Sequence, residues 1–404
     1  MAKKLSSVLG IDIGSQTIKI AEVKLQGGRP TVTALGMAQT PEGAVDHIGI
    51  HDPNGVSDVL KSLCASAGAT TNEVVASIAG QGSVLVRTLE VPAMNDSELK
   101  QHMDWEITRN IPFAESTVVS DFKAFSPEAG NMQNMDVVMA ISPQSAIDTL
   151  VGLLKKSGRK PAAIDVEALG IARALDSSYH NDLMGKSVCV VDIGHKTTSI
   201  NVYKDGKLMM PRQVPIGGEM MTRAISENMG VTTEEAANIK ALQAEIPSDV
   251  GGGAAYNPFD TGATTQAFAP YNPFAEPDES ISEPVSEARP EEPEPMPVPA
   301  QNPQAPNQAY QAMAGILDEF VAEVRRSIDY FRSKGGDVDM IMVCGGGSKL
   351  KGLSVFLESA LGLPTELLDP LKGLNVNVKK YDNYRDEDRH DFTVAVGNGL
   401  HICF

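Results

Sequence analysis

The sequence predicts a two-lobed, layered α/β protein, because one unit of strands and turns occurs in it twice. The first copy, Val8–Met37, reads as three strands of alternating apolar and polar residues with a tight turn after Asp12-Ile13-Gly14. The second copy, Val188–Gly217, repeats the pattern with its turn after Asp192-Ile193-Gly194. Helix-like segments follow both copies, as in layered α/β folds. We therefore expect two related lobes, each opening with an antiparallel three-stranded unit.

The elements outside the repeats complete this layout. The first helix of each lobe ends at a glycine, Gly68 or Gly230, a favourable residue at a helix C-terminus. Two strands and two helices between the lobes predict a small inserted β/α subdomain. Later, a long amphipathic helix precedes a strand that runs into Gly345-Gly346-Gly347. The expected helices are 57–67, 97–110, 143–157, 219–229, 311–333 and 353–361, and the expected strands are 84–89, 136–141 and 339–344.

A proline-rich acidic segment interrupts the second lobe. Residues 247–309 contain thirteen prolines, ten acidic residues and one basic residue, Arg289, and so carry a charge of −9. Such a composition cannot bury enough apolar area to offset the entropy of ordering the chain, so we expect a disordered insertion. Tyr-Asn-Pro-Phe occurs in it twice, at 256–259 and 271–274, either as a docking motif or as a chance repeat.

The overall composition limits the partners that we expect. The net charge is −18, from 52 acidic residues against 34 Lys and Arg, which excludes a broad electrostatic attraction to nucleic acid or anionic lipid. The four cysteines are far apart in the sequence, so neither a zinc site nor a disulfide framework is predicted, and a reducing cytosol fits. Gly10 and Asp12 interrupt the apolar start, and no apolar run approaches the length of a membrane span. We therefore expect membrane association only through a partner.

Three loops carry the residue types that bind phosphate and nucleoside. In the first, Gly14 lets backbone N–H groups approach an anion, beside Asp12 and the donors Ser15, Gln16 and Thr17. The second, 192–198, repeats this device, so two opposed turns would clamp a polyphosphate while both aspartates hold Mg²⁺ through waters. In the third, glycines 345–347 and Ser348 follow a strand and precede a helix, so a flat base or ribose can lie on the backbone.

Several other residues have more than one interpretation. Lys196 in the second turn either pairs with a phosphate or is solvated, and we do not expect its neighbour His195 to be a general base. Trp105 lies on a predicted helix and either packs in a core or lines a groove for a partner peptide. His47 and His51 have the spacing of a helical metal site, but Gly49 and Pro53 predict a loop without a transition metal.

The three loops, in this order, resemble those of the actin, sugar kinase and Hsp70 superfamily. The matching motifs are VLGIDIGSQTIKIAEV for phosphate 1, VCVVDIGHKTTSINVY for phosphate 2 and MIMVCGGGSKLKGL for adenosine. FTVAVGNGLHI at 392–402 looks like the small helix about which such lobes hinge. Within the superfamily the chain resembles the PilM family, the FtsA-like assembly proteins of type IV pili. That resemblance rests on Val86-Arg87, Val91-Pro92, Asp104-Trp105-Glu106, Ile111-Pro112-Phe113, Asp121-Phe122 and AIDVEALGIARAL at 163–175.

The resemblance implies an actin-like two-lobed ATPase fold, with duplicated RNase H-like lobes, that binds ATP and Mg²⁺. Asp12 and Asp192 would be the catalytic and metal residues, organising Mg²⁺ through water, and Lys240 would lie near the base or ribose. Ala237 stands where relatives often have a carboxylate for the ribose hydroxyls, which weakens the expected affinity. The residues implied to contact the nucleotide are Gly14, Ser15, Gln16, Thr17, Lys19, Gly194, Thr197, Gly217, Gly218, Lys240, Gly345, Gly346 and Ser348.

The implied role is that of a cytoplasmic scaffold, at most a slow ATPase, held at the inner membrane by a protein. It would recruit the N-terminal cytoplasmic peptide of a PilN-like membrane protein through Trp105, Ile111, Phe113 and Asp121. Other pilus ATPases and self-association stay open as further interactions. The expected divisions are 1–83, lobe I with the phosphate-1 hairpin; 84–160, the inserted subdomain; 161–187, a return to lobe I; 188–246, lobe II with the phosphate-2 hairpin; 247–309, the acidic insertion; 310–391, lobe II with the adenosine motif; and 392–404, the hinge helix.

Two alternatives stay open, an FtsA-like division scaffold and a small-molecule kinase or Hsp70-like ATPase. A sugar kinase needs an acidic general base beside its substrate pocket, and none stands out. An Hsp70 needs a substrate-binding region after its ATPase, whereas four residues follow Leu400. An FtsA-type scaffold ends in a basic amphipathic membrane helix, which VGNGLHICF does not provide. These features favour the pilus assignment.

Overall fold

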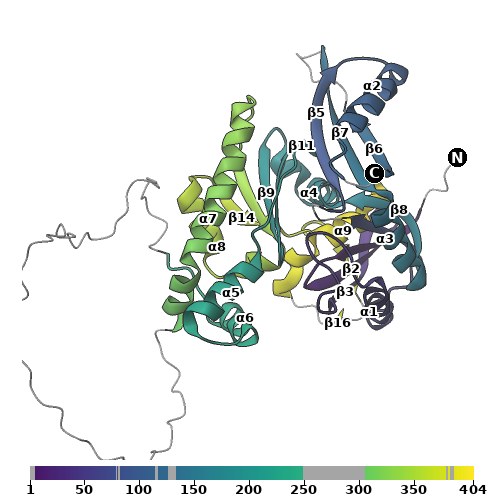
Figure 1. The fold of residues 1–404 in the computed structure, drawn as a ribbon. Helices are drawn as coiled ribbons and strands as arrows, with labels where there is room; N and C mark the ends of the chain where they lie inside the picture. The colour runs from purple at the N-terminus through teal and green to yellow at the C-terminus, as the bar shows by residue number, and fades with distance from the viewer. Residues whose placement is uncertain are drawn as a thin grey trace, which may run out of the picture.

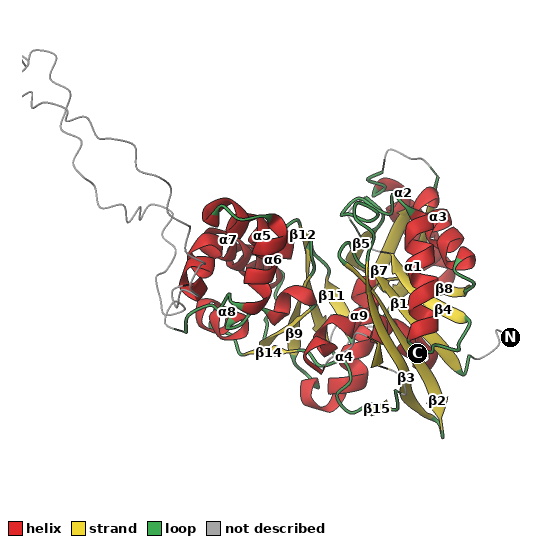
Figure 2. Cartoon of the chain, turned by 90° about the horizontal axis from the view of Figure 1, so that it is seen from below, coloured by secondary structure: helices red, strands yellow, loops and turns green. Residues whose placement is uncertain are grey.

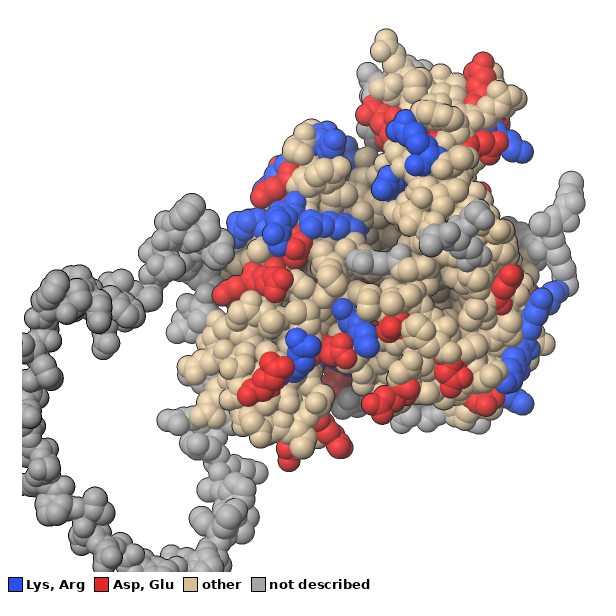
Figure 3. All heavy atoms as spheres, viewed as in Figure 1, with Lys and Arg blue, Asp and Glu red and all other residues tan. Residues whose placement is uncertain are grey.

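The computed structural model describes residues 5–78, 80, 82–113, 117–125, 133–248, 305–378, 381–382 and 386–404. Residues 249–304, which contain most of the expected acidic insertion and both Tyr-Asn-Pro-Phe motifs, lie outside this description. The described chain forms two lobes and a smaller sheet-and-helix unit that projects from them (Figure 1). Side chains of both charges are spread over the face shown in Figure 3. Within the described ranges, no helix is long and apolar enough to cross a membrane.

Lobe I is built on a seven-stranded mixed sheet in the order β15-β3-β2-β1-β4-β8, with β16 also paired to β3. The first three strands are antiparallel, whereas β4 and β8 continue the sheet in parallel. Helices α1 and α3 cover one face through an apolar core. The strands are β1 (Ser7–Ile13), β2 (Thr17–Gln26), β3 (Arg29–Gln39), β4 (Glu73–Ile78), β8 (Lys160–Val166), β15 (Asn375–Val376) and β16 (Tyr381–Asp382), and the helices are α1 (Pro53–Ser66) and α3 (Gln144–Lys156).

Lobe II repeats this arrangement in a six-stranded sheet, β11-β10-β9-β13-β14, with β12 also paired to β10. Its first strands are antiparallel and its last two pairings parallel, as in lobe I. The predicted duplication is therefore confirmed at the level of topology. The strands are β9 (Ser187–Ile193), β10 (Thr198–Lys204), β11 (Lys207–Met210), β12 (Gln213–Val214), β13 (Met340–Cys344) and β14 (Thr365–Leu367), and the helices are α5 (Gly218–Met229), α6 (Thr233–Leu242), α7 (Ala305–Ser333) and α8 (Leu353–Leu361).

Two elements of lobe II differ from the expectation. The third strand of the repeat is split into β11 and β12 around Pro211, because proline has no N–H to give to the ladder. Helix α7 begins at Ala305 rather than at 311, inside the segment assigned to the insertion. Pro306 lies in its first turn, where proline is tolerated, and Ala309 is buried in the core.

The projecting unit is a three-stranded antiparallel sheet, β5-β7-β6, with one helix on it. Its strands are β5 (Leu85–Pro92), β6 (Val118–Ala124) and β7 (Asn134–Pro143), and the helix is α2 (Asp96–Arg109). Asn95 caps α2, and Glu98 completes a capping box. Leu99, Met103 and Ile107 recur on one face of α2 and pack on the sheet.

Two helices lie between the large sheets, α4 (Glu167–Leu183) and α9 (Thr393–Gly399) (Figure 2). They cross closely because glycines meet at the contact: a Cβ on Gly397 would lie 1.9 Å from the carbonyl oxygen of Gly170. Helix α9 also lies against β1, where buried Asn398 donates to the carbonyl of Ile11. The Ala/Gly segment 392–402, which is expected to act as a hinge, thus lies packed between the two lobes.

Candidate functional site

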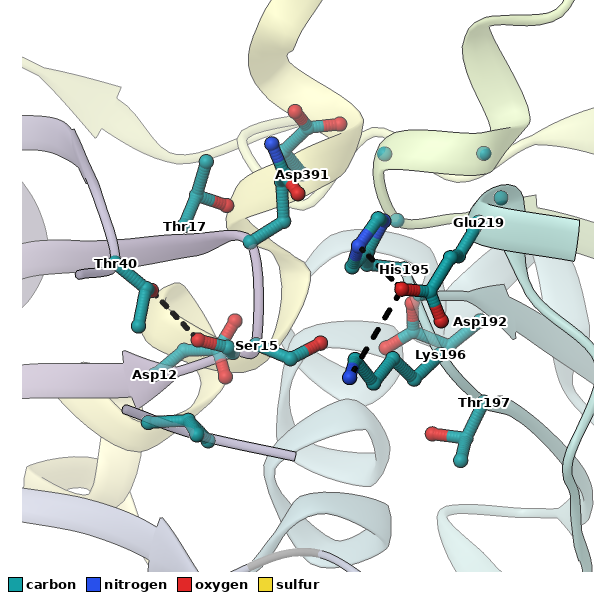
Figure 4. Close-up of a pocket in the computed structure, with 18 of the residues that line it drawn as sticks. Asp12, Ser15, Thr17, Thr40, Asp192, His195, Lys196, Thr197, Glu219 and Asp391 are labelled. Atoms are coloured by element: carbon teal, nitrogen blue, oxygen red, sulfur yellow. Dashed lines mark hydrogen bonds and ion pairs between the residues drawn. The ribbon is translucent and has the colours of Figure 1, made fainter. Parts of the chain in front are cut away.

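A cleft of about 2280 Å³ separates the lobes, and all three glycine-containing loops line it. The turn after β1 comes from lobe I, and the turn after β9 comes from lobe II. The third loop, η1 (Gly346–Lys349), follows β13. In the close-up, Asp12 and Ser15 face Asp192, Lys196 and Thr197 across the cleft (Figure 4). The structure therefore brings the two predicted turns together.

The two turns are constructed in the same way. In the first turn, the N–H of Gly14 donates to the carbonyl oxygen of Thr17 at 3.0 Å. In the second turn, the N–H of Gly194 donates to the carbonyl oxygen of Thr197, also at 3.0 Å. A Cβ would lie 2.7 Å from this oxygen at Gly194, too close for a side chain, and 3.0 Å from it at Gly14, where the contact would be tight. A second layer braces each turn: Thr40 donates to the carbonyl of Gly14, and the N–H of Gly218 donates to that of Gly194.

The third loop needs its glycines for different reasons. Gly345 has φ +78°, and a Cβ on it would lie 2.2 Å from Oδ1 of Asp192. A Cβ on Gly347 would lie 2.2 Å from Cγ2 of Ile193, so there is no room for a side chain. A Cβ on Gly346, by contrast, would have no neighbour within 4 Å among the described residues. Its lack of a side chain therefore leaves open space that a flat group can occupy. Ser348 is buried and donates to the carbonyl of Gly345, which closes the loop.

A group of carboxylates faces this cleft with too little positive charge beside it. Burial and the charges of Glu167 and Asp12 raise the pKa of Asp192 well above its usual range. Burial also raises the pKa of Glu167, although it accepts a hydrogen bond from Ser199. The compensating cation is Lys19, whose amine lies 3.0 Å from Asp12. Burial opposes its charge, but the nearby aspartates raise the pKa of Lys19 overall.

Glu167 and Asp391 were not among the residues that the sequence singled out. Glu167 is the first residue of α4, directly after the parallel strand β8, and the carboxyl ends of such strands are where α/β folds place ligands. That position was a usable signal. Asp391 accepts from Lys349, yet its Oδ1 is buried and has no hydrogen-bond partner in the described part of the chain. An unpartnered buried oxygen at a cleft indicates a missing partner.

These observations fit a hydrated Mg²⁺ better than a directly bound metal. No three His, Cys, Asp or Glu side chains in the described ranges are grouped to hold a metal ion themselves. Crowded carboxylates with raised pKa values would be relieved by a cation nearby, and Mg²⁺ usually keeps several waters while phosphates supply other ligands. Asp12, Asp192 and Glu167 are therefore suited to holding its waters.

Lys240 is close to the second turn but already engaged. Its amine donates to the carbonyl of Gly218 and to Oγ1 of Thr222, each at 2.6 Å. Burial without a carboxylate partner lowers its pKa to about 8. Both Lys240 and Ala237 lie on the cleft wall formed by α6. Gly217 lies against the backbone of His195, where a Cβ would come within 2.4 Å of its carbonyl oxygen.

The four residues expected to bind a partner do not form one surface. Trp105 is 54% exposed on the outer face of α2, where the Arg109 guanidinium lies 4.6 Å from its ring. Ile111 and Phe113 pack against the core of the projecting unit, and Phe113 also lines the cleft. Asp121 is exposed on β6, on the sheet face away from α2, because alternate residues Phe122 and Ala124 face inward. The expected loop at 47–51 is confirmed, with His51 2.9 Å from Asp46.

Comparisons with known proteins agree with this architecture. A family model described as type IV pilus assembly protein PilM matches residues 10–267, and a model of the cell division protein FtsA matches residues 189–397. A chain of the solved PilM-PilN type IV pilus biogenesis complex aligns over 100% of both chains, with a TM-score of 0.74 and 23% identity. The ethanolamine utilization protein EutJ from Carboxydothermus hydrogenoformans aligns over 98% of this chain and 91% of its own, with a TM-score of 0.51 and 14% identity.

Curated relatives match over a shorter segment. FtsA of Bacillus subtilis (strain 168) is 30% identical over 97 residues, which are 24% of this chain and 21% of FtsA. FtsA of Neisseria meningitidis serogroup B is 29% identical over 96 residues, 22% of its length. The matched segment thus spans about a fifth of these relatives. Together with the duplicated topology, the family and structure matches show an actin-like ATPase fold.

Proposed function

Because this chain belongs to the PilM family of type IV pilus assembly proteins, an FtsA-like branch of the actin-fold ATPases, we propose that it is an ATP-binding scaffold of a pilus assembly platform. The observation that carries the nucleotide part is the pair of identically built turns that face each other across the cleft, next to the open space at Gly346. Polyphosphate would lie between the turns and the nucleoside against η1. Mg²⁺ would screen the phosphate charge, with its waters held by Asp12 and Asp192.

The experiment for this part is a calorimetric titration of the full chain with ATP and Mg²⁺. We expect saturable binding by the wild type and a loss of at least about tenfold in affinity in Asp12→Asn, because the variant removes a charge that holds metal-bound water. Asparagine keeps an acceptor for Lys19, so the fold should be retained, as the melting temperature will report. An absence of binding at millimolar ATP would contradict the nucleotide part of the proposal.

The partner part of the proposal concerns the N-terminal cytoplasmic peptide of a PilN-like inner-membrane protein. The solved relative with the highest TM-score given above is part of a PilM-PilN complex, which supports the same kind of partner here. We place the peptide at the end of the cleft between lobe I and the projecting unit, where the wall is apolar: Val45, Ile48, Ile50, Phe113, Ala146 and Leu150. Ile48 is 54% exposed there although it is a large apolar side chain. The protein would then act in the cytoplasm and reach the membrane through this partner.

We expect Ile48→Asp to weaken binding of that peptide at least about tenfold, because a carboxylate would be desolvated at the centre of an apolar contact. Its side chain is exposed in the free protein, so the melting temperature should stay unchanged. Co-purification and fluorescence anisotropy with the cytoplasmic segment of the partner measure the effect. Trp105→Ala is the matched variant on the outer face of α2. If only this variant loses peptide binding, the peptide binds to α2 and not in the cleft.

A further inference from the structure

The second turn carries two basic side chains, His195 and Lys196, and one carboxylate lies between them. Oε1 of Glu219 is 3.7 Å from Nε2 of His195 and 3.9 Å from Nζ of Lys196. All three side chains line the cleft. Figure 4 shows the Lys196 chain extending from the second turn toward the side of Ser15, with Glu219 above it.

Backbone hydrogen bonds fix the place of this carboxylate. The N–H of Glu219 donates to the carbonyl of His195 at 2.8 Å, and the N–H of Gly218 donates to that of Gly194 at 3.0 Å. Glu219 is thereby held in the first turn of α5, directly over the second turn of the site. The position of Glu219 therefore follows from the fold rather than from an attraction to His195 and Lys196.

The ion pairs themselves are weak enough to exchange. Both distances exceed that of a hydrogen bond, and the Glu219 side chain is 49% exposed, so solvent screens the attraction. A terminal phosphate between the turns carries more charge and accepts charge-assisted hydrogen bonds from a lysine amine. Lys196 would therefore leave Glu219 when such a phosphate is present.

We propose that Lys196 and Glu219 form a charge latch that selects nucleotides by their terminal phosphate. This inference rests on the proposed function. In the free protein Glu219 holds the amine of Lys196 at the edge of the cleft. When a nucleoside triphosphate binds, its terminal phosphate pairs with this amine instead. A diphosphate is one phosphate shorter, so Lys196 stays paired with Glu219. Lys196 is then the residue that favours the triphosphate over the diphosphate. Glu219 competes with the terminal phosphate for the amine of Lys196 and so limits this preference.

The test measures the affinities of ATP and ADP, each with Mg²⁺, for the wild type and four variants of the full chain. We expect Lys196→Met to weaken ATP about tenfold and ADP less than twofold. Glu219→Gln should tighten ATP about threefold, and this gain should fall below twofold when Lys196→Met is also present, because the two residues act as a pair. Glu227→Gln, on the same helix and paired with Arg223, is the control for a general charge effect.

A second readout needs no nucleotide. Burial lowers the pKa of His195, while the carboxylate of Glu219 raises it, so Glu219→Gln should lower it further in an NMR titration of the free protein. An unchanged His195 pKa in that variant, equal losses of ATP and ADP in Lys196→Met, or equal effects of Glu219→Gln and Glu227→Gln would overturn the latch and leave the proposed nucleotide site standing. If the wild type binds neither nucleotide, both proposals fail.

Discussion

Gly346→Val is expected to reduce ATP affinity at least about thirtyfold without lowering the melting temperature, whereas Gly345→Val is expected to unfold lobe II. The two residues are neighbours, but their surroundings differ. A Cβ on Gly346 has no neighbour within 4 Å in the described structure, so a side chain can begin there without a clash and extend into the space proposed for the nucleoside. A Cβ on Gly345 would lie 2.2 Å from Oδ1 of Asp192 and 2.7 Å from the carbonyl oxygen of Ile193, at φ +78°.

The cost at Gly345 should reach at least about 3 kcal/mol, because strain at a left-handed φ and a backbone clash add. Thermal unfolding followed by circular dichroism separates the two variants, and calorimetry with ATP and Mg²⁺ reports binding. Gly346→Ala is the graded control, with an intermediate loss of affinity. If Gly346→Val binds ATP as the wild type does, the nucleoside does not lie on η1.

The contrast between these glycines shows what the sequence could and could not predict. The Gly-Gly-Gly-Ser loop and both Asp-Ile-Gly turns were found because each is a local signal at the end of a strand of alternating residues. Asp192 and Ile193, about 150 residues earlier in the chain, decide that a side chain would clash at Gly345 but not at Gly346. Only the parallel pairing of β9 with β13 brings those segments together.

The missed elements have similar causes. β4 is a six-residue apolar strand, too short for its pattern to distinguish it from a helix segment. β6 contains the exposed polar residues Ser120, Asp121 and Lys123, so its apolar signal is weak. Glu167 lies in the stretch 163–175 that carries the family resemblance, but neither Glu167 nor Asp391 belongs to one of the three nucleotide-binding motifs. α4 and the segment before α9 bring them to the cleft from distant parts of the sequence.

Trp105 illustrates the opposite case, in which two interpretations followed from the sequence and the structure excludes one of them, packing in a core. The spacing of Leu99, Met103 and Ile107 already defines the buried face of α2, and Trp105 lies two residues from Met103, on the far side of the helix. Its exposure follows from that period. The grouping of Trp105 with Phe113 and Asp121, however, came from the family resemblance, which does not show on which face of the sheet each side chain lies.

The substitution Asp192→Asn is expected to stabilise the nucleotide-free protein by about 1 kcal/mol at neutral pH while it weakens Mg²⁺-dependent ATP binding about 10–100-fold. Burial and the charges of Glu167 and Asp12 disfavour the ionised form of Asp192, so its pKa is higher in the folded than in the unfolded chain. The proton is then bound more tightly by the folded state, and stability is lost as the pH rises through the folded-state pKa. Asparagine has nearly the same shape and no charge, so it avoids this loss.

The difference in stability between the wild type and Asp192→Asn should depend on pH. Below the ordinary aspartate pKa of 3.8, both states of the wild type are protonated and the two proteins should be about equally stable. Above it, the advantage of Asp192→Asn should grow until the pH passes the raised pKa of the folded state. Urea unfolding at several pH values measures this difference. Asp182→Asn, at the surface beside Lys372, is the control and should leave the stability nearly unchanged, because solvent screens an exposed ion pair.

Asp192 is expected to lower the stability of the nucleotide-free protein, yet it lies in the cleft. A cation that binds together with the nucleotide would account for its presence there. The raised pKa of Asp192 and the unpartnered Oδ1 of Asp391 both indicate that the nucleotide-free cleft lacks a positively charged or hydrogen-bonding partner. If Asp192→Asn instead destabilises the free protein, or binds ATP with Mg²⁺ as tightly as the wild type, Asp192 serves the packing of Gly345 and not the ligand. The combination of gained stability and lost affinity is therefore the result that distinguishes a functional carboxylate from a structural one.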